Sequence, residues 1–244
     1  MKRMACLLLL LTMGLWVHGQ GSSDYNQRLY LSYVEGEMGP WKGILQEMDR
    51  EYERTGDQTL LYYLCFAYYG YVGYLISEEK EDKMVKEDLE AAINRTDELY
   101  EILDGREDIL ALQGALMGFR IYLSKFSSMF LGPKTTKYIK TAYETGGAYF
   151  NCHLEMGNML FYTPKILGGS QTQAIPYYEK AVEILERSQF KTDRNWIYLN
   201  SVLVLANAYQ ETDRKELACL LYEDLLEYEP EAKWIREDLY AKCK

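Results

Sequence analysis

Two adjacent residues, Cys152 and His153, are the pair in this sequence that could carry nucleophilic chemistry. A thiol beside an imidazole can form a reactive thiolate, provided that both side chains reach the same substrate atom. The surrounding pattern predicts a helix over 148–162, and neighbouring positions on a helix point about 100° apart, so this pair cannot do so. The sequence also lacks an HExxH motif, a P-loop, a Rossmann glycine set and a nucleophile elbow. We therefore expect a protein that is not an enzyme.

The acidic residues and cysteines show no spacing typical of a metal site. Residues 78–82 read EEKED, an acidic run in a predicted turn, which indicates a solvated surface and not a calcium loop. The cysteines beyond the N-terminal segment lie far apart and form no CxxC pair, which argues against zinc binding and thiol redox chemistry. The sequence therefore predicts no metal and no cofactor.

Four cysteines follow the N-terminal segment: Cys65, Cys152, Cys219 and Cys243. Three disulfide pairings are open to them, and the sequence does not choose among these. Cys65 lies in an aromatic predicted helix, and Cys219 lies beside Ala218 in a leucine-rich one. We expect most of the four to be buried as small apolar side chains.

Tyrosine offers the clearest candidates for binding, since the sequence holds 23 of them. Six fall in the predicted helix 57–77, where they spread around the circumference, so some must face a groove or a second neighbour. The rigid ring with its hydroxyl tip suits peptides and amphipathic small molecules. Helix packing would also consume aromatic rings, and both roles stay open. The candidates for lining a groove on the concave side of the fold are Tyr63, Phe66, Tyr69, Tyr149, His153 and Met156.

Residues 1–23 have the layout of a secretory signal peptide, which predicts an exported protein. Lys2 and Arg3 precede an apolar run at 4–17 and a stretch of small polar residues at 19–23. The run is short for a membrane span, so no stable span is expected after cleavage. Removing these two cations takes the formal charge from -10 to -12. Such a charge disfavours nucleic acid or anionic lipid as the main partner, because phosphate binding needs concentrated Lys and Arg.

Helical periodicity runs through nearly all of the remaining chain. Apolar residues recur three and four apart, as in 84–103, and only 5 prolines and 18 glycines interrupt the pattern. The breaks are short, so successive helices should be antiparallel neighbours in one unit over 24–244. Asp213 and Glu216 are placed as N-cap and N3 of the helix 216–228, and Gly132 with Pro133 forms a break. The other predicted helices span 25–36, 40–54, 57–77, 106–127, 133–145, 148–162, 172–189, 195–210 and 231–242.

A repeated helix pair carries the strongest resemblance to known proteins. In 199–232, and less regularly in 150–185, small and aromatic residues recur at the spacing of the tetratricopeptide repeat, which the sequence resembles. Small residues let two helices approach, and tyrosines fill the groove beside them. The sequence thus predicts an all-α fold, a right-handed α-solenoid of about five antiparallel pairs. The packing positions are Leu205, Ala206, Tyr209, Ala218, Tyr222 and the exit residue Pro230 in the last repeat, and Gly157, Ala174, Tyr178 and Ala181 in the earlier one.

Three segments together are similar to the T component of tripartite ATP-independent periplasmic transporters. They read AYYGYVGYL at 67–75, AAINRTDELYEIL at 91–103 and TPKILGGSQTQAIPYYEKAVEIL at 163–185. The resemblance covers roughly 57–228. It implies a periplasmic scaffold with a central hydrophobic channel that binds a ligand and hands it to a partner.

The loop at 163–170 is longer than the usual connection between the two helices of a tetratricopeptide repeat. Pro164 disfavours helical backbone in the residue before it, so the chain must leave the stack there. Gly168 and Gly169 can adopt positive φ and lead into the next helix. The loop is either an ordinary insertion or a segment that reaches over the concave face or to a partner, with Ile166 and Leu167 as its contact residues.

The sequence leaves two hypotheses for the function open. The first is a non-enzymatic exported scaffold, periplasmic by its family resemblance, that binds a polypeptide partner through its tyrosine-rich concave face. The second is an accessory subunit of a transport system that carries an apolar small molecule. A closed cavity lined by Tyr, Phe and Met would favour the carrier, and an open groove with polar rims would favour the protein-binding scaffold.

Overall fold

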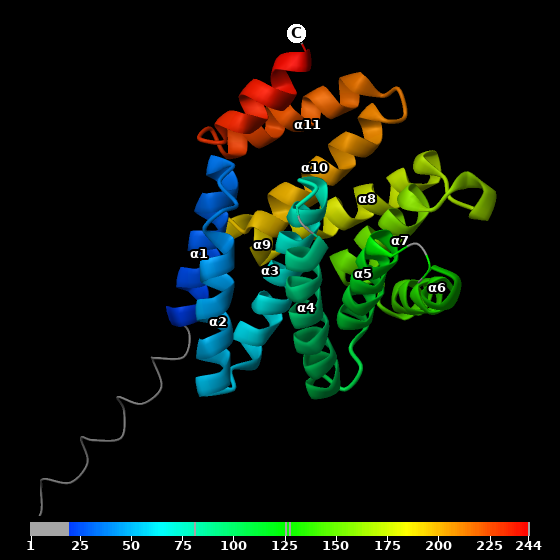
Figure 1. Ribbon diagram of the computed structural model, residues 1–244. Coiled ribbons are helices and arrows are strands. Elements are labelled where there is room, and N and C mark those ends of the chain that lie inside the picture. The colour runs from blue at the N-terminus through cyan, green and yellow to red at the C-terminus, as the bar shows by residue number, and fades with distance from the viewer. Residues whose placement is uncertain (1–19, 81, 125, 127, 244) are drawn as a thin grey trace, which may run out of the picture.

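The computed structural model describes residues 20–243 except 81, 125 and 127. Within this part of the chain every regular element is a helix, which confirms the all-α prediction (Figure 1). The expected signal peptide lies mostly outside the described residues. The helices are α1 (Gln20–Glu35), α2 (Trp41–Thr55), α3 (Gln58–Ser77), α4 (Asp82–Ile102), α5 (Glu107–Leu123), α6 (Ser128–Thr145), α7 (Phe150–Tyr162), η2 (Lys165–Leu167), α8 (Gln171–Glu186), α9 (Gln189–Thr192), α10 (Trp196–Gln210), α11 (Lys215–Tyr228), η3 (Ile235–Leu239) and η4 (Tyr240–Cys243).

Capping residues account for several of the helix ends. Asp57 caps α3 by accepting hydrogen bonds from the backbone N–H groups of Thr59 (2.8 Å) and Leu60 (3.3 Å). Gly56 ends α2 with a φ of 66°, a left-handed conformation that glycine adopts without a steric penalty. The predicted helices 57–77 and 40–54 therefore agree with α3 and α2 to within one residue.

Three helix predictions are wrong in detail. Pro133 does not break the chain but lies inside α6, where it removes one backbone donor just one turn after the helix begins, in an exposed turn. Asp213 is not an N-cap, because it has a φ of 59° and α11 begins two residues later. The predicted helix 172–189 ends at Glu186 and is followed by the separate short helix α9.

Five consecutive helix pairs make up the fold. They are α1–α2, α3–α4, α5–α6, α7–α8 and α10–α11, and each pair packs on the next along the chain. Figure 1 shows neighbouring helices running side by side from the N-terminal pair through the middle of the molecule to the C-terminal pair. This is the architecture of a helical repeat or solenoid protein.

The first pair also touches the last one, so the stack curls until its ends meet. α1 packs against α10. The hydroxyl of Tyr30 donates to the Glu229 carboxylate (2.7 Å), and the indole N–H of Trp234 donates to the Tyr33 carbonyl (3.1 Å). Figure 1 shows the blue end of the chain meeting the red end. The inner side of the curl is consequently filled by packed side chains.

The third helix forms the centre of that packing. Half of its residues are buried, among them Leu61, Leu64 and Val72. α3 is also the one helix of the described residues that is long and apolar enough to cross a membrane. Its burial between neighbouring helices accounts for this composition, as in the core helix of a globular domain.

One pair of cysteines is joined, which corrects part of the prediction for these residues. Cys219 on α11 forms a disulfide with Cys243 at the end of η4. Cys219 is therefore not a free apolar side chain, because the C-terminal segment (residues 229–243) folds back along α11 and brings the two sulfurs together. Cys65 and Cys152 are free and buried, and burial raises the pKa of each thiol to about 12, which disfavours the thiolate form.

The residues expected to pack the repeats lie inside the helix pairs. Ala206 and Ala218 are fully buried where α10 meets α11, and Pro230 follows the end of α11 in an exposed turn. The Tyr209 hydroxyl donates to Glu179 of α8 (2.7 Å), which ties one pair to the next. The remaining packing positions are also buried: Leu205, Tyr222, Gly157, Ala174, Tyr178 and Ala181.

Gly157 allows the closest approach within the α7–α8 pair. A Cβ atom at this position would lie 2.6 Å from Cε1 of Tyr178, whose hydroxyl donates to the Asn158 side chain (2.9 Å). We expect Gly157→Ala to lower the free energy of unfolding by about 1–2 kcal/mol, because the clash outweighs the gain in helix propensity. Urea denaturation measures this. Gly118→Ala is the matched control, since nothing lies within 4 Å of that site, and an equal loss there would contradict the packing account.

Candidate functional site

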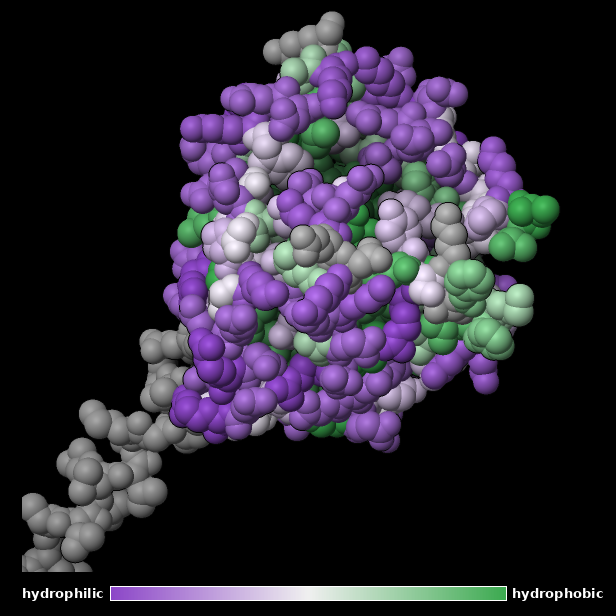
Figure 2. Space-filling view, viewed as in Figure 1, coloured by the Kyte–Doolittle hydropathy of each residue, from purple (hydrophilic) through white to green (hydrophobic). Residues whose placement is uncertain are grey.

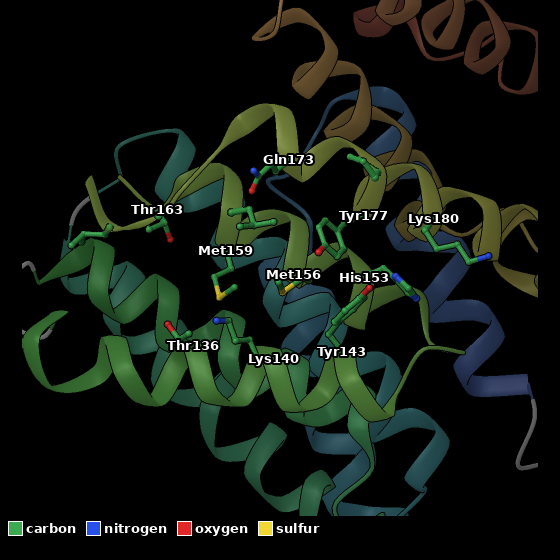
Figure 3. Close-up of a pocket in the computed structure, with 14 residues that line it drawn as sticks. Thr136, Lys140, Tyr143, His153, Met156, Met159, Thr163, Gln173, Tyr177 and Lys180 are labelled. Atoms are coloured by element: carbon green, nitrogen blue, oxygen red, sulfur yellow. The ribbon is translucent and has the colours of Figure 1, made fainter. Parts of the chain in front are cut away.

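A hollow in the described structure lies between α6, α7 and α8 and reaches the η2 turn. Its volume is about 770 Å³, and it opens to solvent on one side. Figure 3 shows side chains from the three helices pointing into this space. The lining residues are Thr136, Lys140 and Tyr143 of α6, His153, Met156, Met159 and Leu160 of α7, Thr163, Leu167 and Gly168 of the loop, and Gln173, Pro176, Tyr177 and Lys180 of α8.

The inner wall of the cavity is aromatic and sulfur-rich. The rings of Tyr143 and Tyr177 meet edge to face with centroids 5.2 Å apart, and Tyr143 meets the His153 imidazole in the same way at 5.3 Å. Met156 and Met159, both on α7, also line the cavity (Figure 3). Thioethers and ring faces form an apolar, polarisable surface that accommodates a flat ligand.

The rim of the cavity carries positive charge. Lys180 forms an ion pair with Glu183 on its own helix (2.9 Å). Lys140 makes no ion pair with any residue that the structure describes, although the protein as a whole is strongly acidic. An ammonium group without a carboxylate partner at the edge of an apolar hollow is suited to binding an anionic group of a ligand.

His153 is the only histidine among the described residues, and its orientation is fixed. Its Nε2 lies 2.9 Å from the carbonyl oxygen of Gly147. Because a carbonyl only accepts, the Nε2–H group is the donor in this contact. The side chain is nearly buried and borders the cavity as a wall.

The loop after α7 closes one end of the cavity. Gly168 has a φ of 92°, as expected, whereas Gly169 is not in the left-handed region. Gly169 is needed for a different reason, because a Cβ atom there would lie 1.7 Å from the carbonyl oxygen of Thr163. Leu167 and Gly168 line the cavity, while Pro164 and Ile166 point to solvent. The loop thus reaches the hollow through two of its five predicted residues.

The structure does not bring the six predicted groove residues together. His153 and Met156 line the cavity, but the three residues on α3 are packed against other aromatic rings. Phe66 meets Phe150 (5.8 Å between centroids), Tyr63 meets Phe190 (6.5 Å) and Tyr69 stacks on Phe119 (5.3 Å). Tyr149 lies beside the Arg106 guanidinium instead. The reason is the curl of the stack, which fills the concave side where an open groove was expected.

Sequence reasoning missed the residues that α6 and α8 contribute. Thr136, Lys140 and Tyr143 recur at four and three along α6, so they share one face of that helix. That spacing could have marked them as a group. Their meeting with Tyr177 and Lys180 of α8 depends on how the three helices pack, which no local pattern defines.

The opposite side of α7 carries a buried polar network. Glu155 is almost fully buried and accepts a hydrogen bond from the Asn158 side chain (3.1 Å), which also donates to the Tyr69 hydroxyl (3.4 Å). Burial raises the pKa of Glu155 to about 7, although its hydrogen bonds with Asn158 and Tyr69 oppose this shift. The network faces away from the cavity and links α7 to α3.

A second, smaller hollow of about 370 Å³ lies between α7, α8, α10 and the C-terminal segment. Two residues predicted to pack the repeats, Tyr178 and Tyr222, border it together with Tyr33 and Trp234. No lysine or arginine lines this hollow among the residues that the structure describes.

Comparisons with known proteins identify the fold. No protein-family model and no curated protein sequence matches the chain. The solved structure of the HusA haemophore from Porphyromonas gingivalis is similar, with a TM-score of 0.59 and 18% sequence identity. The match covers 80% of this chain and 96% of that one. At this identity the likeness shows a common helical fold.

Proposed function

We propose that this protein is an exported, non-enzymatic binding protein whose α6–α7–α8 cavity holds a flat, anionic ligand of the porphyrin class. The observation that carries the proposal is the composition of the cavity. An aromatic and thioether wall, made by Tyr143, Tyr177 and two methionines, borders a rim with two lysines. A porphyrin has matching chemistry, since its ring is planar and apolar and its propionates are negatively charged.

The size of the cavity agrees with such a ligand. Small-molecule sites are clefts of about 300–1,000 Å³ with apolar walls and a few placed polar groups. The volume of about 770 Å³ lies within this range, and the opening to solvent leaves room for the carboxylates at the surface. The similar fold of a haemophore makes haem the first porphyrin to test.

A small ligand fits the observed surface better than a polypeptide does, although the cavity is open and its rim is polar. The polypeptide hypothesis needs a tyrosine-rich groove along the concave side, and Tyr63, Phe66 and Tyr69 are instead packed against neighbouring rings. The disulfide between Cys219 and Cys243 supports the exported location, because such bonds persist in oxidising compartments. A periplasmic or cell-surface accessory role in uptake of the ligand follows as part of the proposal.

The proposal predicts binding that depends on the rim lysines and not on iron. Titration of the mature protein with haem and with iron-free protoporphyrin, followed by visible absorbance and by quenching of tryptophan fluorescence, should give dissociation constants that agree within about threefold. Lys140→Glu combined with Lys180→Glu should raise both constants by about tenfold, because two attractive contacts with carboxylates become repulsive.

Lys215→Glu combined with Lys233→Glu is the matched control, since both residues are exposed and lie outside the cavity. It changes the net charge equally and should leave binding intact. The porphyrin site would be refuted if neither haem nor iron-free protoporphyrin bound. It would also be refuted if the control variant lost as much affinity as the variant with Lys140→Glu and Lys180→Glu. Binding of haem but not of iron-free protoporphyrin would mean that an iron ligand, and not the ring and its carboxylates, determines recognition.

A further inference from the structure

Two protruding loops expose most of the large apolar side chains at the surface. The first apolar tip, at the α5–α6 connection, consists of Tyr122, Phe126, Met129 and Phe130, and the second, at the η2 turn, consists of Tyr162, Ile166 and Leu167. These seven side chains are between 65% and 93% exposed, and no other large apolar side chain in the described chain reaches 60%. Figure 2 shows apolar surface gathered on the edge of the molecule where α6 and the η2 turn lie in Figure 1.

The two tips lie on the same side of the fold. They terminate neighbouring helix pairs, because α6 packs on α7 and α7 packs on α8. The first half of α6, through Thr136, and the η2 turn, through Leu167, both border the same cavity. The tips therefore flank one end of that cavity.

The charge around the tips is opposite to that of the rest of the protein. The sequence holds 37 acidic residues, yet none occurs in 109–143 or in 156–178, the two stretches that contain the tips. The same stretches contain one arginine and five lysines. Lys137 and Lys165 make no ion pair with any described residue, and Lys134 lies over the Tyr138 ring (5.1 Å). This surface therefore attracts anions although the whole chain is acidic.

We propose that the two apolar tips dock the protein on an anionic lipid bilayer, with the end of the cavity that they flank facing the membrane. Apolar side chains that protrude separately from the surface can each insert into a lipid bilayer, whereas a protein partner would need a separate pocket for each of them. Phenylalanine, isoleucine and leucine enter the acyl boundary, tyrosines lie at the headgroup level, and lysines contact the phosphates. The overall negative charge does not prevent this, because screening limits its effect to about one Debye length.

Co-sedimentation with vesicles tests this inference, and ligand-free protein is used so that the outcome is independent of the porphyrin proposal. The mature protein should bind vesicles of mixed phosphatidylglycerol and phosphatidylcholine at least tenfold more tightly than vesicles of phosphatidylcholine alone. Added salt should weaken the binding. Phe130→Ser with Ile166→Ser should lower the affinity for the mixed vesicles at least tenfold, and Lys134→Glu with Lys137→Glu should abolish the preference for them.

Leu217→Ser with Leu220→Ser is the control, because these exposed leucines lie on α11, away from the tips. It should bind vesicles as the unchanged protein does. Failure of the unchanged protein to bind the mixed vesicles overturns the inference, and so does an equal loss in the α11 variant. All substituted side chains are exposed, and circular dichroism melting verifies that each variant is folded. The variant with Lys134→Glu and Lys137→Glu tests the role of the positive charge independently of the apolar side chains.

Discussion

Replacing Cys219 and Cys243 together by serine is expected to lower the free energy of unfolding by about 3 kcal/mol. The disulfide closes a loop with a sequence separation of 24, which restricts the unfolded chain, and a loop of this length gives an effect of that size. The bond also holds the C-terminal segment on α11. From there Trp234 contacts α1, with its ring 5.9 Å from that of Tyr33.

Guanidinium denaturation monitored by circular dichroism measures the loss. The unchanged protein in reductant should unfold at the same denaturant concentration as the double serine variant. Reductant should have no effect on that variant, because Cys65 and Cys152 are free in the fold. Equal stability of the variant and the oxidised protein would show that the disulfide does not restrain the C-terminal segment.

The second large effect concerns the buried carboxyl of Glu155. Its pKa is raised from the ordinary 4.5 to about 7, so the folded protein holds a proton that the unfolded chain releases between these values. The contribution of Glu155 to the free energy of unfolding is therefore fully present below pH 4.5 and is lost as the pH rises to about 7. The loss should amount to about 3 kcal/mol, since one pKa unit corresponds to about 1.4 kcal/mol.

Glu155→Gln should remove this dependence, because a neutral amide keeps the size of the side chain and carries no charge at any pH. The difference in unfolding free energy between variant and unchanged protein, measured in urea from pH 4.5 to pH 8, should grow in favour of the variant by about 3 kcal/mol. The exposed Glu227→Gln serves as control and should show no such growth. A difference that is constant with pH would mean that Glu155 is ionised throughout.

The helices could be predicted closely because each carries its own pattern and its own end signals. α3 is bounded by Asp57 and a polar turn, and α10 begins after Asn195, whose side chain accepts from the Ile197 N–H. Pro133 misled the prediction since a proline rule considers only the local chain, whereas helix α6 tolerates the residue one turn after its start. Spacing alone assigned Gly157 and Tyr178 to packing positions, and the structure shows that the two residues meet.

The site could be predicted only in part, because it depends on contacts between distant segments. His153 and Met156 lie on a single helix, and periodicity placed them on one face. Lys140 and Tyr177 join them through the packing of three helices. The α3 tyrosines were assigned to a groove because an open solenoid would leave its concave side exposed. The contacts of α1 with α10 and with the end of α11 close that side, and they join residues as far as 199 positions apart, as in the Tyr30 to Glu229 hydrogen bond.

The meeting of the two chain ends changes how this repeat protein must unfold. In an open array each unit contacts only its neighbours, so terminal units fray first and the rest unzips stepwise. Here the terminal pairs protect each other through Tyr33, Trp234 and Glu229. Neither terminal pair can detach without breaking the contact between the two ends of the stack. This contact couples the five pairs into one cooperative unfolding transition. Its formation during folding requires slow, long-range closure of the chain. A truncation at either terminus should therefore loosen the entire protein, including the distant α6–α7–α8 cavity.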